Sequence, residues 1–162
     1  MGYYVRAFCT SDRVPTIKEI FDWAASQGYK LGVSDNFKDI DMKSNNWERV
    51  DILYKAGKLP ILSEINRDEG TDNCLMREEI EEFKERLSEV RGLLNIKKKK
   101  VETHLANTRY IVANELPISN IDDDGYNANY IFLKYFVVHC GGMIQANGEG
   151  FYEGDKLIIK ID

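Results

Sequence analysis

The chain has few of the residues that build disulfides and metal centres: only three cysteines and two histidines among 162 residues. Cys9, Cys74 and Cys140 are odd in number and widely spaced, so they predict neither a disulfide framework nor a paired zinc site. We therefore expect free thiols, no bound metal and no other cofactor. A low cysteine content without a disulfide framework is typical of proteins in a reducing, cytoplasmic setting.

Long apolar segments are also missing. The longest apolar run, at residues 130–138, is interrupted by Lys134 and is far too short to span a bilayer. The first residues contain no basic region followed by an apolar stretch and a small-residue cleavage site, so no signal peptide is expected. We expect a soluble protein without a membrane partner.

Signatures of catalysis and of nucleic-acid binding are absent from the sequence. It contains no P-loop, HExxH, GxSxG or CxxC motif, and no glycine-rich loop that opens a helix after a strand. The net charge of -5 gives no general attraction to nucleic acid. The one basic run, Lys97–Lys100, lacks interleaved aromatic residues or arginines, so we expect a solvated helix end rather than a phosphate contact.

The clearest positive signal is an apolar seam with spacings of 4, 3, 4, 3 and 4 residues, which predicts one narrow face of a helix. The seam consists of Met76, Ile80, Phe83, Leu87, Val90 and Leu94. Such a face packs on a sheet of its own chain or on a second copy, and we expect a homodimer through it.

A second seam follows at Val101, Leu105, Thr108 and Val112. We favour one long, bent helix over residues 74–115, or a helix that ends in the lysines, because four lysines in the first turn of a new helix would oppose the helix dipole. The alternative is a helical hairpin that breaks near Gly92 and Asn95.

The remaining patterns alternate between strands and helices. Strands are predicted at residues 3–9, 29–33, 47–54 and 59–66, and helices at residues 16–27 and 127–140. Thr16 and Glu19 have the spacing of a capping box at the start of the first helix. The tail from Met143 onward alternates around turn signals and predicts a small β unit.

These elements predict an α+β fold with a mixed or antiparallel sheet, long amphipathic helices and a C-terminal β-hairpin unit. The opening order β-α-β-β-β-α is compatible with a ferredoxin-like start. A single domain over residues 1–162 is expected, and the alternative is an α/β sandwich at 1–95 with a helical and β-hairpin extension at 96–162.

The leading functional hypothesis is a protein-interaction module of the inhibitor, immunity-type or accessory-subunit class. It rests on the absence of a catalytic constellation and on the acidic amphipathic helix, whose partner is another protein or a second copy. The expected contact residues are Glu78, Glu79, Glu82 and Glu85.

The alternative hypothesis is a small enzyme or ligand binder with a site where the sheet meets the apolar helix at 127–140. Its candidate residues are His139, Cys140 and Glu149, joined by Cys9 and Tyr152. The acidic stretch Asn120–Gly125 resembles half of an EF-hand loop, but the twelfth position is Ile131, so helix capping is the preferred interpretation.

Overall fold

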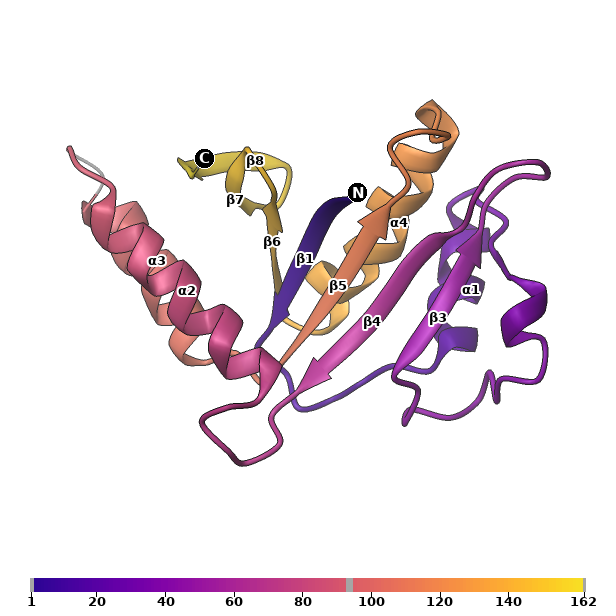
Figure 1. The fold of residues 1–162 in the computed structure, drawn as a ribbon, viewed down its shortest axis with the longest axis horizontal. Coiled ribbons are helices and arrows are strands. Elements are labelled where there is room, and N and C mark those ends of the chain that lie inside the picture. Colours follow the sequence, from indigo (N-terminus) through magenta and orange to yellow (C-terminus); the bar gives the residue numbers. More distant parts are fainter. Residues whose placement is uncertain (1, 93–94, 162) are drawn as a thin grey trace.

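In the computed structural model, which describes residues 2–92 and 95–161, eight strands form one antiparallel sheet in the order β2-β3-β4-β5-β1-β6-β7-β8 (Figure 1). The strands are β1 (Tyr3–Cys9), β2 (Gly32–Val33), β3 (Arg49–Leu53), β4 (Ile61–Arg67), β5 (Tyr110–Leu116), β6 (Gly142–Ala146), β7 (Gly150–Glu153) and β8 (Lys156–Lys160). The helices are α1 (Ile17–Ser26), α2 (Leu75–Glu89), α3 (Asn95–Ala106), α4 (Asp123–His139) and the short 3-10 helix η1 (Asp35–Phe37). The predicted α+β class is confirmed.

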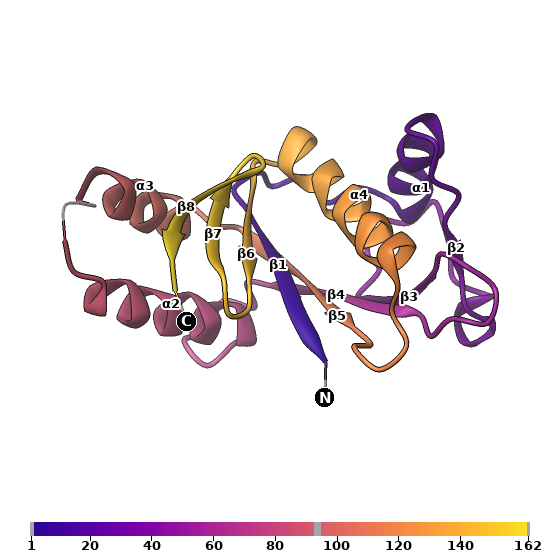
Figure 2. The same ribbon diagram turned by 90° about the horizontal axis from the view of Figure 1, so that it is seen from above.

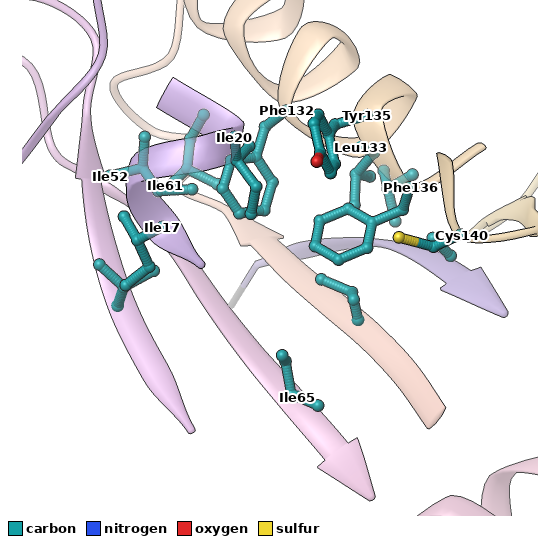
Figure 3. Close-up of a cluster of buried hydrophobic side chains, with 14 of the residues drawn as sticks. Ile17, Ile20, Ile52, Ile61, Ile65, Phe132, Leu133, Tyr135, Phe136 and Cys140 are labelled. Atoms are coloured by element: carbon teal, nitrogen blue, oxygen red, sulfur yellow. The ribbon is translucent and has the colours of Figure 1, made fainter. Parts of the chain in front are cut away.

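Helices cover both faces of the sheet, α1 and α4 on one and α2 and α3 on the other (Figure 2). Alternation along β1 separates the two cores: Ala7 and Cys9 belong to the α1–α4 side, whereas Phe8 belongs to the α2–α3 side. In Figure 3, residues of α1 and α4 meet side chains of β3 and β4 in the first core. Each helix pair therefore buries its apolar stripe on the same sheet.

Capping residues in the sequence determine where α1 and α4 begin. The Thr16 hydroxyl accepts a hydrogen bond from the Glu19 amide, and the Glu19 carboxylate accepts one from the Thr16 amide, which forms the predicted capping box. The helix predicted over 127–140 begins four residues earlier, because the Asp122 side chain accepts from the Gly125 amide and caps it. None of the described helices has both the length and the apolar character that a membrane span requires.

The ferredoxin-like start is not confirmed, because α2 packs on the opposite face of the sheet from α1. The helix that shares a face with α1 is α4. It connects β5 to β6, two parallel strands between which β1 is inserted. The apolar helix near the C-terminus thereby completes the layer that α1 begins.

The prediction of one long helix over 74–115 is wrong. The chain leaves α2 after Glu89, forms α3, and returns as β5 between β4 and β1. Val112, assigned to the second seam, is a residue of this strand, and Leu94 lies outside the described residues. The helical hairpin, our alternative, is therefore the arrangement of this segment.

The dipole argument against a break before the lysines failed because burial outweighs it. A charge at the wrong helix end costs about 0.3–1 kcal/mol, whereas burying one aliphatic side chain contributes about 1.5–3 kcal/mol. Val101 and Leu105 of α3 are buried in the second core. Lys100 also forms an ion pair with Glu153 of β7, which gives one of the lysines an anionic partner.

The apolar seam of α2 is covered within the protein. Met76, Ile80, Phe83 and Leu87 are all buried, and the Phe83 ring lies 5.6 Å from the rings of both Phe8 and Phe151. Because the sheet and α3 already cover this face, it offers no surface for a second copy. The physical argument for a homodimer through the seam no longer holds.

Stability should fall between pH 7.5 and pH 5.5 because of His104. Its Nε2 lies 2.7 Å from the Phe8 carbonyl oxygen, and burial lowers the pKa of the imidazole below its ordinary value. The unfolded chain then binds the proton more readily, so the stabilisation is present above the ordinary histidine pKa and is lost as pH falls through it. We expect His104→Gln to reduce the fall in Tm across this range.

The control is His139→Gln, since His139 is the other histidine and is exposed. Melting curves of the three proteins at both pH values provide the measurement. An equal dependence on pH in wild type and His104→Gln would contradict the prediction.

Candidate functional site

A cleft with a volume of about 720 Å³ lies between α4 and the strands β1, β6 and β7. Its apolar lining comes from both layers: Val5, Leu116, Ile118, Leu133, Val137, Ile144 and Ala146. Its polar lining consists of Tyr3, Tyr126, Asn129, Tyr130, Lys134, Glu149, Tyr152 and Asp155. An apolar cavity of this size with a few convergent polar groups is the usual form of a small-molecule site.

One group of polar residues gathers around Glu149, in the turn between β6 and β7. The Tyr3 hydroxyl donates a hydrogen bond to Glu149 Oε2 at 2.5 Å. Burial, followed by the hydrogen bond and the charge of Glu149, raises the pKa of Tyr3 well above its ordinary value. Burial and the same carboxylate raise the pKa of Tyr152. Both phenols are therefore protonated at neutral pH and keep their hydroxyl groups as donors.

A second polar group lies where α4 approaches the β7–β8 turn. Lys134 Nζ donates to the Tyr130 hydroxyl at 2.6 Å, and this hydroxyl donates to Asp155 Oδ1 at 2.6 Å. Lys134 also lies 3.4 Å from the same carboxylate and over the Tyr130 ring. The hydrogen bond to Tyr130, and then the contact with Asp155, raise the pKa of Lys134. The lysine charge is thus balanced within the protein.

Asn129 of α4 supplies a buried polar group to the cleft. It is 5% exposed, and its Oδ1 accepts a hydrogen bond of 2.8 Å from Asn114 of β5. Asn114 pairs in register with Ser63 of β4, and both of these side chains are fully buried. The hydrogen bond from Asn114 orients the Asn129 amide, whose NH₂ group is then left as a donor beside the cleft.

The structure separates the candidate residues predicted around α4. Glu149 and Tyr152 both line the cleft. His139 is exposed and stacks at 4.5 Å from Tyr135 and at 6.0 Å from Trp23 of α1, on the other flank of α4. Cys140 is buried in the first core, where Figure 3 shows its sulfur beside Phe136.

No family model, curated protein or solved structure matches this chain.

The buried thiols should be inert in the folded protein. Cys9 and Cys140 are fully buried, and burial raises the pKa of both thiols. Because the thiolate is the reactive form, we expect slow alkylation of the native protein and fast alkylation of all three cysteines in urea. Mass spectrometry after iodoacetamide treatment measures this, and rapid native labelling of Cys140 would restore it as a candidate nucleophile.

The acidic residues of α2 do not form a uniform surface. Glu79 is mostly buried, with Oε2 2.9 Å from Arg6 Nε and Oε1 accepting from Asn66, so it belongs to an internal network. Burial raises the pKa of Glu79, and Arg6 opposes this shift. Glu78, Glu82 and Glu85 are exposed, and Glu82 pairs with Arg86 on the same helix.

The acidic residues of the partial EF-hand pattern have other partners. Asp122 caps α4 and lies 3.1 Å from Lys55 Nζ, and Asp124 lies 2.9 Å from the same ammonium. These contacts raise the pKa of Lys55 and lower that of Asp122. The two carboxylates thus fasten the start of α4 to the turn between β3 and β4.

Three tyrosines of the cleft, Tyr3, Tyr126 and Tyr130, were missed by sequence reasoning. Tyr126 and Tyr130 recur at the helical interval of four and project from α4 towards the cleft, but alone this spacing also fits an ordinary core. Tyr3 comes from the first strand. Only the placement of β1 beside β6 brings it to Glu149.

Proposed function

We propose that this protein binds a small, mostly apolar molecule in the cleft between α4 and the strands β1, β6 and β7. The observation that carries the proposal is the size and lining of this cleft: apolar side chains from helix and sheet, with tyrosines and charged groups around them. The volume falls within the range of small-molecule sites, about 300–1,000 Å³. A binding role, rather than catalysis, is supported because His139 and Cys140 lie away from the cleft.

A neutral apolar dye, N-phenyl-1-naphthylamine, tests this proposal. We expect a saturable rise in its fluorescence with one site per chain, and displacement of the dye by 1-octanol. The variant Ile144→Asn should weaken dye binding about tenfold, because it places an amide in the apolar lining.

The matched control is Leu157→Asn in β8. Leu157 is also a partly exposed aliphatic strand residue, but it does not line the cleft. We expect it to leave dye binding unchanged. Failure of the dye to bind the folded wild-type protein, or equal weakening by both substitutions, would overturn the proposal.

A second candidate function is recognition of a basic protein surface by the outer face of α2. The supporting observation is that Glu78, Glu82 and Glu85 are exposed on one helix of an acidic protein. We expect the triple change of these residues to lysine to abolish capture of a specific partner in quantitative pull-downs. Identical captured proteins with wild type and variant would reject this surface.

A further inference from the structure

The cleft carries a charge that the protein does not balance. Among the described residues, Glu149 takes part in no ion pair, although it lines the cleft and accepts a hydrogen bond from Tyr3. Lys134 is the only basic residue among those described in the lining, and it is bound to Asp155. The Glu149 region is therefore a negatively charged part of a mostly apolar site.

Two tyrosines, Tyr3 and Tyr152, lie beside this carboxylate. The Tyr3 hydroxyl donates a hydrogen bond to Glu149 directly. Tyr152 lies close enough to Glu149 that the carboxylate raises the pKa of the Tyr152 phenol. Tyr126 is a further neighbour of Tyr3. Tyrosine rings attract a cation over their faces, and an organic ammonium group is favoured most where rings combine with an anion. A negative charge beside Tyr3 and Tyr152, with Tyr126 near Tyr3, is complementary to such a group.

The same residues do not suit an inorganic cation. Calcium takes six to eight oxygen ligands, and magnesium takes six in near-ideal octahedral geometry. The Glu149 region offers one carboxylate, and no cluster of three or more metal-ligating side chains occurs in the described parts of the chain. Apolar carbon around the charge favours an alkylated ammonium over a hydrated ion.

From this complementarity we infer that the ligand of the cleft is an amphipathic organic cation. Its ammonium group lies against Glu149, Tyr3, Tyr126 and Tyr152, and its apolar part lies along Leu133 and Ile144. The inference rests on the proposed ligand-binding function and adds the chemical class of the ligand. Neutral and anionic molecules of equal length should bind more weakly.

Competition against N-phenyl-1-naphthylamine tests the charge preference directly. The competitors are octyltrimethylammonium, 1-octanol and octanoate, which share an eight-carbon chain and differ in head group. We expect octyltrimethylammonium to bind about fivefold or more tightly than 1-octanol, and octanoate to bind most weakly.

The substitution Glu149→Gln should remove the preference for the cation over 1-octanol, because the amide carries no charge while its oxygen still accepts from Tyr3. The matched control is Glu153→Gln, an exposed glutamate outside the cleft lining, which should keep the preference. Tyr126→Leu provides a second variant on a side chain that is 47% exposed, and it should reduce binding of the cation more than binding of 1-octanol.

The outcomes separate this inference from the proposed function. If neither the dye nor 1-octanol binds, the proposed function itself fails. If both bind but the cation has no advantage, or if its advantage survives in Glu149→Gln, only the assignment of an organic cation is overturned.

Discussion

The substitution Leu87→Ala is expected to destabilise the protein by about 2–5 kcal/mol and to lower its Tm by about 10 °C. Leu87 is fully buried on the seam of α2, in the cluster that contains Phe8 and Phe151. Removing its side chain loses apolar burial and leaves a cavity between the helix and the sheet. Urea and thermal unfolding followed by circular dichroism measure the loss.

The matched control is Leu75→Ala on the same helix. Leu75 is 49% exposed, so we expect a change within about 0.5 kcal/mol. Both proteins should be measured at widely different concentrations, because a seam that held two copies together would make stability depend on concentration. A small effect of Leu87→Ala, or a strong concentration dependence in wild type, would contradict the arrangement described here.

The second large effect is expected from Gly150→Ala, at the first residue of β7. Gly150 has φ of +139°, and a Cβ atom there would lie 1.9 Å from the carbonyl oxygen of Ile159 on the paired strand β8. The obstructing atom belongs to the backbone, so relief requires that β7 and β8 separate. We expect a loss of about 3 kcal/mol or more, or failure to obtain folded protein.

Gly148→Ala is the control in the adjacent turn. Gly148 also has positive φ, +73°, but a Cβ atom there would meet nothing within 4 Å. Only the backbone strain of a left-handed alanine remains, and it costs about 1–2 kcal/mol. Equal stability of the two variants, measured by urea unfolding, would show that the contact between Gly150 and Ile159 is not tight.

Gly150→Ala also bears on the cleft, because Gly150 follows Glu149 directly. Movement of β7 would displace Tyr152 and the turn that holds Glu149. If Gly150→Ala yields folded protein, we expect it to weaken binding of the amphipathic cation as well. Gly148→Ala should keep that binding.

Local sequence patterns were sufficient to predict a helix where its whole apolar face packs on one surface. Three patterns each identified a helix from neighbouring residues alone: the capping box at Thr16, the alternating four- and three-residue spacing of the α2 seam, and the apolar segment of α4. The seam also predicted correctly which face of α2 is buried. The spacing did not reveal whether a sheet or a second copy covers that face.

Local sequence patterns gave the wrong secondary structure where consecutive parts of a segment pack on different elements of the fold. Val101 and Leu105 belong to α3, while Val112, at a compatible spacing, belongs to β5. Over so few residues, the apolar pattern of a helix cannot be distinguished from that of a buried strand. The choice of strand depends on main-chain hydrogen bonds from β5 to β1 and β4, which are distant in sequence.

The sequence by itself determined the α+β class, the helices α1 and α4 and the buried face of α2, because these follow from local periodicity and capping. The tertiary structure alone decided that β5 lies between β1 and β4, that α2 faces away from α1, and that Tyr3 meets Glu149 across 146 positions of chain. Long-range strand pairing decides these features, since it joins residues whose spacing in sequence carries no signal. The cleft exists only after that pairing, so its tyrosines could not be selected from the sequence.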